Sequence, residues 1–486
     1  MVCPAYCSYL VQIVPIKDTR SLTIIFPFPD LIDEYKSHSV GYISHILGHE
    51  GSGSLMSVLR RKGWVTSLSA GYRPNATGFG AFRITMDLSI EGLGNTENIV
   101  AEVFKAISLI RSSGPHKWIF DEYKGLRNID FMFKDKEGAM KLAIATSSDL
   151  HHIPMEDVLS SPYIMQDYHP ERIRELTEML TPSNMWYRVV AKKFEELPDL
   201  TKEPVYETSM RNRKIDTAVV DRFWSALKSR HPEYLHLPPK NDYIAEKFDQ
   251  KQREPVQNKH PEMILNTPWM RLWFKQDDEF KMPKMITKLG LACPFTSTSP
   301  RAAVIAGMTI SCLEDGLVEE VYSADLAGLH KYIDPTPNGV DIRVRGFDEK
   351  LPLFLLDLLK KVVEFKPDEG RFNILKESLI RNLKNFSKGQ PYQLSQYMQS
   401  VLLTEKTWTK EQLLSVADSV HLSDIAVGVP QFLSAFHVEM FVHGNATKQE
   451  ALTMADESVR LLRSANVHSR LGSFTLPLGP VLPFIG

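Results

Sequence analysis

The chain has 486 residues, enough for two large domains or about three of average size, each able to bury a core without disulfides or metals. Its 57 basic and 59 acidic residues give a formal charge of −2, which argues against a nucleic-acid-binding protein and against a membrane-surface protein. Hydrophobic residues make up 43% and charged residues 24%, as in ordinary globular proteins.

Cysteine usage and the N-terminus indicate the compartment. The four cysteines are too few for a disulfide framework, and none has the two-residue spacing of a zinc site. No basic residue precedes the apolar stretch that ends at Val14, unlike in a secretory signal, and no apolar run is long enough to span a bilayer. We expect a cytoplasmic protein without a membrane partner, with the mitochondrion and the peroxisome left open.

The first half of the chain has a mixed helix and strand pattern. Residues 82–90 alternate between apolar and polar side chains, which is typical of a half-buried strand. An apolar stripe then begins near Thr96, and Gly114-Pro115 would end that helix. In chain order we predict an amphipathic segment at 42–61, a strand at 82–90, helices at 96–113 and 118–140, and a strand at 186–191.

The same order returns about 250 residues later, as expected of an internal repeat. The second set comprises an amphipathic segment at 302–317, a strand at 340–345, helices at 355–365 and 371–386, and a strand at 437–443. We therefore predict an α+β fold of tandem duplicated α/β sandwich domains, each an antiparallel sheet packed on helices. Two unrelated α+β domains that share this order are the alternative.

A stretch rich in proline and lysine separates the two sets. Residues 237–261 contain few apolar side chains and many charges, which is typical of a linker between two bodies that move relative to each other. The predicted organisation is a first unit at 1–236, the linker at 237–261, a second unit at 262–470 and a tail at 471–486.

A catalytic zinc site needs several protein ligands and a base near the bound water, and histidines at a suitable spacing would indicate one. The nearest approach to His-x-x-Glu-His is His45-Ile46-Leu47-Gly48-His49-Glu50, in which glycine takes the place of the glutamate. Glycines just after it would fray a helix. His151-His152 and the pair His437 and Glu439 lack further ligands. Ordinary structural histidines are the favoured interpretation throughout, and no complete catalytic apparatus is recognised.

A possible peptide-binding strand follows this motif. Residues 64–71 read as a strand ending in small side chains, before a loop at 73–75. Small side chains at an exposed strand leave backbone groups open to an incoming extended peptide. The Glu50 carboxylate is placed to pair with the amino terminus of such a peptide. A plain edge strand is the equally weighted alternative.

Several longer runs carry a family resemblance. They are Pro15–Arg20, Gly48–Leu55, Lys62–Val65, Phe133–Glu137, Leu272–Asp278, Ala324–Leu329, Trp408–Lys410 and His443–Lys448. Together they resemble the pitrilysin family of zinc metallopeptidases. This resemblance implies four homologous α+β domains in two bowl-shaped halves, which close around a peptide chamber, and the chain is similar to the second and third of them.

The resemblance also implies where chemistry is missing. The family's zinc motif lies in its first domain, so we expect this chain to bind no zinc although the family uses it. The tail at 471–486 would lead to an absent fourth domain. Gly138 and Met140 stand where animal members carry anion-sensing arginines, so activation by polyphosphate is not expected.

By position, the resemblance implies an exosite that anchors the amino terminus of a peptide substrate. Its residues would be His45, Gly48, Glu50, Leu68 and Gly71. Residues 69–70 are Ser-Ala where the family tends to Val-Gly, and the additional Cβ atom at residue 70 would hinder close approach of a peptide backbone.

Three functions are compatible with these sequence features. The first is the non-catalytic central portion of a zinc metalloendopeptidase, which binds peptide substrates and works with a catalytic subunit or as a homo-oligomer. The second is a free-standing peptide-binding or regulatory protein without peptidase activity. The third is a peptidase with an unorthodox metal site at His45, His49 and Glu50. Whether the chain is an enzyme by itself stays open.

Overall fold

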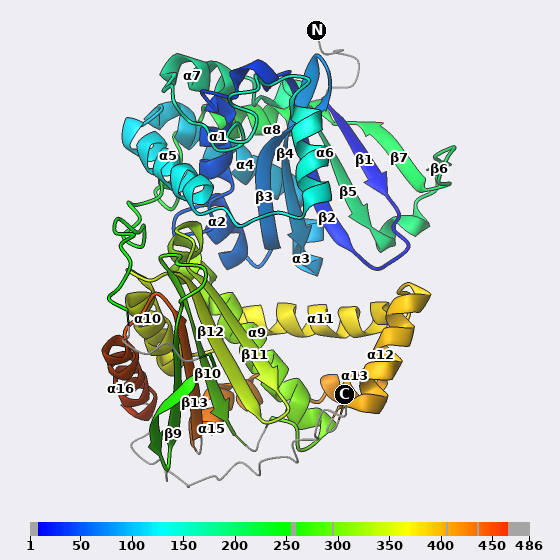
Figure 1. The fold of residues 1–486 in the computed structure, drawn as a ribbon. Helices are drawn as coiled ribbons and strands as arrows, with labels where there is room; N and C mark the ends of the chain where they lie inside the picture. The colour runs from blue at the N-terminus through cyan, green and yellow to red at the C-terminus, as the bar shows by residue number, and fades with distance from the viewer. Residues whose placement is uncertain (1–7, 254–258, 294–295, 405–406, 435–436, 465–486) are drawn as a thin grey trace. The chain divides into compact units, whose positions relative to one another are not determined.

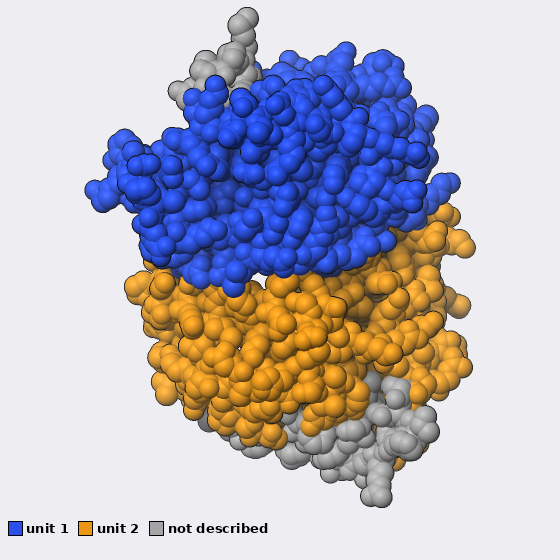
Figure 2. Space-filling model, turned by 180° about the vertical axis from the view of Figure 1, so that it is seen from behind, with its two compact units in different colours: residues 1–240 blue, residues 241–486 orange. Residues whose placement is uncertain are grey.

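The computed structural model describes residues 8–253, 259–293, 296–404, 407–434 and 437–464 (Figure 1). The chain forms two compact units, Met1–Lys240 and Asn241–Gly486, which Figure 2 shows in two colours. The tail predicted at 471–486 lies outside the described residues, as do Cys3 and Cys7. Each unit combines one sheet with helices, which confirms the predicted α+β class.

The sheet of unit 1 is mixed. Its strands are β1 (Tyr9–Ile13), β2 (Arg20–Pro29), β3 (Val65–Ala76), β4 (Phe79–Leu88), β5 (Trp186–Ala191), β6 (Thr201–Lys202) and β7 (Ser209–Lys214). They are ordered β3-β4-β2-β5-β1-β7-β6. β1 and β5 pair in parallel, whereas β2 pairs with both β4 and β5 in antiparallel fashion. One parallel pair therefore interrupts the antiparallel sheet that the sequence predicted.

Helices accompany this sheet, and all of them except α6 (Ala139–Asp149), which has no buried residue, contribute buried residues to the unit. They are α1 (Ser39–Leu47), α2 (Leu55–Arg61), α3 (Ile90–Gly94), α4 (Thr96–Ser113), α5 (Lys117–Met132), α6 (Ala139–Asp149), α7 (Pro170–Glu178) and α8 (Thr217–Lys228). Phe26 of β2 meets Phe104 of α4 edge-on, with 6.2 Å between ring centroids. Gly114, at φ 68°, ends α4 as predicted, because glycine adopts this backbone conformation without strain.

Unit 2 repeats this topology. Its strands are β8 (Glu262–Thr267), β9 (Met270–Gln276), β10 (Lys284–Ala292), β11 (His330–Thr336), β12 (Gly339–Phe347) and β13 (His437–Gly444), ordered β11-β12-β10-β13-β9-β8. β13 is antiparallel to β10 and parallel to β9, as β5 is to β2 and β1. Five consecutive positions thus match between the sheets in order and direction, which confirms the predicted duplication.

The helices of unit 2 cover the sheet and extend from it. They are α9 (Pro300–Leu326), α10 (Leu351–Glu364), α11 (Glu369–Phe386), α12 (Pro391–Leu403), α13 (Lys410–Ala417), α14 (Leu422–Ala426), α15 (Gly428–Ser434) and α16 (Lys448–Ser464). A small separate core joins α9 to α11 and α14 through Met308, Phe372 and Ile425. Among the described residues, no helix is both long enough and apolar enough to cross a bilayer.

Three predicted elements of unit 1 differ from the structure. The helix predicted at 118–140 ends at Met132, and α6 is a separate helix. Glu137, in the connection between them, pairs with Lys134 at 3.4 Å and with Lys141 at 2.9 Å. The amphipathic segment at 42–61 is two helices, α1 and α2. Residues 73–75 belong to β3 and not to a loop, since an edge strand tolerates a proline.

Part of the segment between the predicted units is held by unit 2. The Tyr243 hydroxyl donates a hydrogen bond to Asp357 at 2.8 Å. The Lys251 ammonium donates one to Glu450 at 2.9 Å. These contacts lie on the C-terminal side of Lys240, where the division between the compact units falls. Residues 241–252 therefore follow the surface of unit 2 over much of their length.

Candidate functional site

The candidate site is the outer edge of the unit 1 sheet. β3 is the last strand in the sheet order and pairs only with β4 within the described residues. Leu68 lies opposite Met86 in this pairing, and Gly71 lies opposite Arg83. Ser67 and Ser69 are exposed on the outward face. An edge strand of this kind offers unpaired N–H and C=O groups to another extended chain.

Helix α1 lies beside this strand. A Cβ atom placed on Gly48, directly after α1, would lie 3.6 Å from the Ala70 nitrogen and 3.7 Å from the Ala70 oxygen. A Cβ atom on Gly71 would lie 3.9 Å from Oγ of Ser44. The structure therefore brings Gly48 and Gly71 to one narrow space, which we call the α1–β3 seam. The absence of side chains at both positions keeps the helix and strand backbones close.

Leu68 contributes to the candidate site in a restricted way. Its side chain is 6% exposed and belongs to the hydrophobic core of unit 1. Only its backbone groups are placed to meet a peptide. Glu50 is half-buried on the connection between α1 and α2, immediately after His49.

The two histidines of this region are held uncharged. The His45 ring stacks on Tyr123 with 5.0 Å between centroids, and burial lowers its pKa to about 4. His49 is 4% exposed, and its pKa is lowered to about 3, chiefly by burial and in addition by His45 and His236. Nδ1 of His49 accepts a hydrogen bond from the Gly51 N–H at 3.0 Å. His49 thus fixes the connection after α1.

The geometry does not fit a zinc site at this motif. The ring centroids of His45 and His49 are 6.0 Å apart at 85°, and Nδ1 of His49 already serves the Gly51 N–H. Throughout the described part of the chain, no group of three or more His, Cys, Asp and Glu side chains is arranged to hold a metal ion. His45, His49 and Glu50 therefore do not form the metal site of the third hypothesis.

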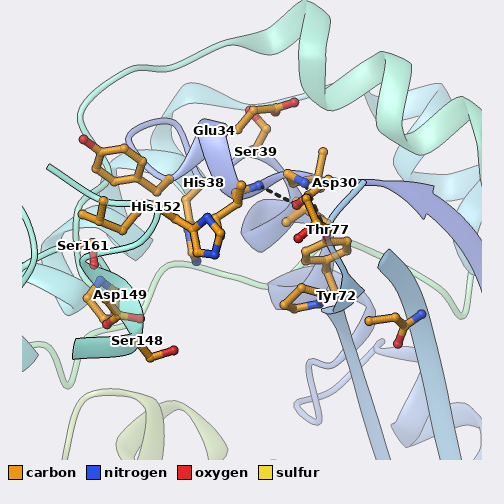
Figure 3. A pocket seen from close by; sticks show the side chains of 18 of the residues that line it. Asp30, Glu34, His38, Ser39, Tyr72, Thr77, Ser148, Asp149, His152 and Ser161 are labelled. Atoms are coloured by element: carbon orange, nitrogen blue, oxygen red, sulfur yellow. Dashed lines mark hydrogen bonds between the residues drawn. The ribbon is translucent and has the colours of Figure 1, made fainter. Parts of the chain in front are cut away.

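Sequence reasoning missed a cavity of about 670 Å³ in unit 1 (Figure 3). Its walls come from the connection between β2 and α1, the first residues of α1, the second half of β3, and the end of α6 with the segment after it. Asp30, Tyr72 and Asp149 are among its polar lining residues. Their positions are up to 119 residues apart (149 − 30), so no local motif marks them.

Two protein-family models match most of the chain. Residues 131–416 match a family model described as the middle or third domain of peptidase M16. Residues 8–126 match a second one described as the peptidase M16 inactive domain.

Individual relatives agree with these matches. The chain is 38% identical to insulin-degrading enzyme of Homo sapiens over 448 residues, covering 92% of this chain and 44% of that protein. It is 37% identical to a putative zinc protease of Caenorhabditis elegans, covering 96% and 46%. The chain thus spans less than half the length of these curated relatives.

A solved structure shows the same fold. The crystal structure of pitrilysin superposes with a TM-score of 0.70 at 21% identity, over 95% of this chain and 49% of that one. The fold agrees with the matches of the family models, one of which alone spans more than half of the chain. The chain therefore belongs to the M16 family of peptidases, the pitrilysin family that its sequence motifs resemble.

Proposed function

We propose that this chain is the non-catalytic central portion of a zinc metalloendopeptidase similar to insulin-degrading enzyme, and that it binds one end of a peptide substrate in the α1–β3 seam. The observation that carries the proposal is the position of β3 at the sheet edge, beside the end of α1. The description of the family model that matches residues 8–126 as an inactive domain supports a binding role for this part of unit 1.

Binding follows from backbone chemistry. An extended peptide adds to β3 along Leu68–Gly71 by main-chain hydrogen bonds, which are largely independent of peptide sequence. Gly48 and Gly71 carry no side chain that would obstruct the approach of its backbone to the edge of β3. The Glu50 carboxylate receives the peptide's terminal ammonium group, since a charge-assisted hydrogen bond is about twice as strong as a neutral one. The exosite is thus assigned to His45, Gly48, Glu50, Leu68 and Gly71, with His45 acting through its packing on Tyr123.

The test is titration of a fluorescent peptide of insulin-fragment size with the full chain. Gly71→Val should weaken binding at least tenfold, because its branched side chain narrows the seam beside Ser44. Gly125→Val is the matched control, since a Cβ atom there meets nothing within 4 Å. Circular dichroism shows whether both variants are folded. Equal affinity of both variants would refute the proposed seam.

The role of Glu50 has its own test. Glu50→Gln should weaken binding of a peptide with a free amino terminus several-fold and leave binding of the acetylated peptide unchanged. This difference isolates the charge pair from other effects of the substitution. If the free and acetylated peptides bind the wild-type chain equally well, Glu50 does not receive the amino terminus.

We also propose that a catalytic metallopeptidase subunit, or a second copy of the chain, completes the working protein. Exposed apolar side chains on α6 support a partner: Met140 is 78% exposed and Ile144 is 64% exposed. In this proposal zinc belongs to the catalytic subunit. Light scattering of the wild-type chain and of Ile144→Glu measures their molar mass in solution. If both have the mass of a monomer, a second copy of the chain is excluded as the partner.

The cytoplasm is the proposed compartment, following the sequence expectation. A relative from Arabidopsis thaliana, 30% identical over 92% of this chain, is named peroxisomal, which makes the peroxisome the alternative to test. Imaging of the tagged full-length chain together with a peroxisomal marker tests the proposal. Peroxisomal or mitochondrial fluorescence would overturn it.

A further inference from the structure

The cavity of about 670 Å³ lies along the same two elements as the α1–β3 seam. Ser39 and Val40, at the start of α1, line it, and so do Tyr72 and Pro74 of β3. The end of α1, at Gly48, faces Ala70, which comes before the cavity-lining residues of β3 in the chain. A peptide that follows β3 past Gly71 would therefore reach the cavity, which makes the cavity's chemistry relevant to side-chain selection.

The cavity has hydrogen-bond acceptors without partners. Ser161 lines it and is only 7% exposed, yet its hydroxyl makes no hydrogen bond with any described residue. The Asp149 carboxylate, also in the lining, has neither a hydrogen bond nor an ion pair within the described residues. Both groups are therefore available to accept hydrogen bonds from a ligand in the cavity.

The other acidic side chains of the cavity are already engaged. Asp30 accepts hydrogen bonds from the backbone N–H groups of Ile32 at 3.1 Å and Gly78 at 2.9 Å. Glu34 pairs with Arg172, whose guanidinium reaches it at 2.6 Å. Asp149 is therefore the carboxylate that remains for a ligand, and no lysine or arginine is found among the described residues that line the cavity.

Local helix stability does not explain a carboxylate at residue 149. Asp149 is the last residue of α6, where a negative charge faces the negative end of the helix dipole. This placement is unfavourable for the helix. A positively charged ligand would remove the unfavourable interaction.

Flat rings form much of the remaining wall. The Tyr72 hydroxyl donates to the Pro29 carbonyl and accepts from the Leu31 N–H, both at 3.2 Å, which fixes its ring. His38 also lines the cavity, and its pKa is lowered to about 4, chiefly by burial and in addition by Arg127. Its imidazole is therefore uncharged at neutral pH and does not repel a cation. Planar guanidinium groups stack well on aromatic faces.

We propose that this cavity binds an arginine side chain of the peptide that is anchored in the α1–β3 seam, with the Asp149 carboxylate and the Ser161 hydroxyl as acceptors. Arginine fits because its guanidinium carries five donors, a full positive charge and a stacking face. The inference rests on the proposed function. The cavity-lining residues 74–76 of β3 are three to five residues past Gly71. A paired peptide advances along the strand at the same rise per residue, so the arginine lies roughly three to five residues along the peptide from the residue that pairs with Gly71.

The experiment compares peptides that differ at one residue. A fluorescent decapeptide of otherwise constant sequence carries arginine, norleucine or glutamate at position 4, 5 or 6, and each is titrated with the full chain. The arginine peptide should bind at least tenfold more tightly than the norleucine peptide at one of these positions, and the glutamate peptide should bind most weakly. Higher salt should reduce the arginine advantage.

Variants of the cavity residues then show whether the arginine side chain binds in the cavity. Asp149→Asn should remove most of the preference for arginine over norleucine while leaving the norleucine affinity unchanged. Ser161→Ala should reduce the preference by a smaller factor. Asp33→Asn is the matched control, because Asp33 is exposed on the same connection as Asp30 and does not line the cavity. It should retain the full preference.

The outcomes separate this inference from the proposed function. If no peptide binds, or if Gly71→Val leaves every affinity unchanged, the anchoring seam itself is refuted. If the peptides bind and Gly71→Val weakens them, but arginine and norleucine bind equally at all three positions, only the arginine cavity is refuted. A preference that survives Asp149→Asn and Ser161→Ala together would also place the basic side chain elsewhere.

Discussion

The imidazole ring of His45 stacks on the phenol ring of Tyr123, with 5.0 Å between the centroids and 20° between the planes. This contact joins α1 to α5 directly beside the candidate peptide-binding edge. Together with His49, which holds the Gly51 N–H, it makes the conformation after α1 depend on two uncharged imidazoles. The stability of unit 1 should therefore depend on pH.

Acidification should destabilise unit 1 through His49. Its pKa falls from 6.5 to about 3 because burial disfavours the charged form, so the unfolded chain takes up the proton first as pH falls. The free energy of unfolding should then decrease by about 2 kcal/mol between pH 7 and pH 5 from this residue alone. Urea titrations at both pH values measure it. His49→Gln should flatten the dependence, whereas the exposed His151→Gln should not.

Two glycines of α3 should respond oppositely to alanine. A Cβ atom on Gly92 would lie 1.9 Å from the Trp64 carbonyl oxygen, so Gly92→Ala must displace the backbone just before β3. We expect a loss of about 2–4 kcal/mol in the free energy of unfolding. Gly94→Ala meets nothing within 4 Å and should be neutral or stabilising by up to about 1 kcal/mol. Similar losses in both variants would contradict this account.

Removing the charge of Glu102 should be costly. This 4% exposed side chain accepts hydrogen bonds from Lys62 at 2.5 Å and Lys105 at 3.1 Å. Burial acts to raise its pKa, but the two lysines lower it overall, so its stabilisation is present above pH 4.5 and is lost as pH falls through the lowered pKa.

The test of this pair is chemical denaturation of Glu102→Gln. The variant should lose about 3 kcal/mol, because two partly buried ammonium groups are left without a counter-charge. Glu97→Gln, in an exposed pair with Arg222, serves as the control and should lose less than about 1 kcal/mol. A loss below that of the control would show that the buried cluster is solvated.

The ion pair between Arg371 and Asp315 in unit 2 tests how much the geometry of an arginine side chain contributes when its positive charge is kept. Arg371 of α11 donates from Nε at 2.9 Å and from a terminal nitrogen at 2.6 Å to the two oxygens of Asp315 on α9. Arg371→Lys keeps the charge but loses the two-pronged contact, so we expect a loss of about 1–2 kcal/mol in thermal or urea unfolding. Arg343→Lys, in the exposed pair with Asp334, should change stability little.

Elements with a strong local pattern were predictable from the sequence. The helix expected at 96–113 coincides with α4, because an apolar stripe and a terminal glycine both specify it. The strand expected at 186–191 coincides with β5 for the same kind of reason. The helix expected at 118–140 was wrong, since α5 ends at Met132 and α6 begins at Ala139, and the apolar periodicity does not mark the break between them.

The candidate site was predictable only in part. Motif resemblance pointed to Gly48 and Gly71, and the structure places both in one seam. Their use in binding stays a prediction. The cavity was beyond sequence reasoning because it depends on contacts such as the hydrogen bond from Tyr35 to Asp157, between residues 122 positions apart. Periodicity reports which face of an element is apolar, and not which distant polar side chains meet.

The hydrogen bonds of residues 241–252 bear on how the second half should be produced by itself. A recombinant fragment that starts at Glu262, the first residue of β8, would lack Tyr243 and Lys251. Asp357 and Glu450 would then lose these hydrogen-bond partners. The fragment would also lose the backbone N–H groups of residues 246 and 247, which Glu349 accepts at 2.7 and 2.8 Å. Expression of a well-behaved fragment should accordingly begin at Asn241.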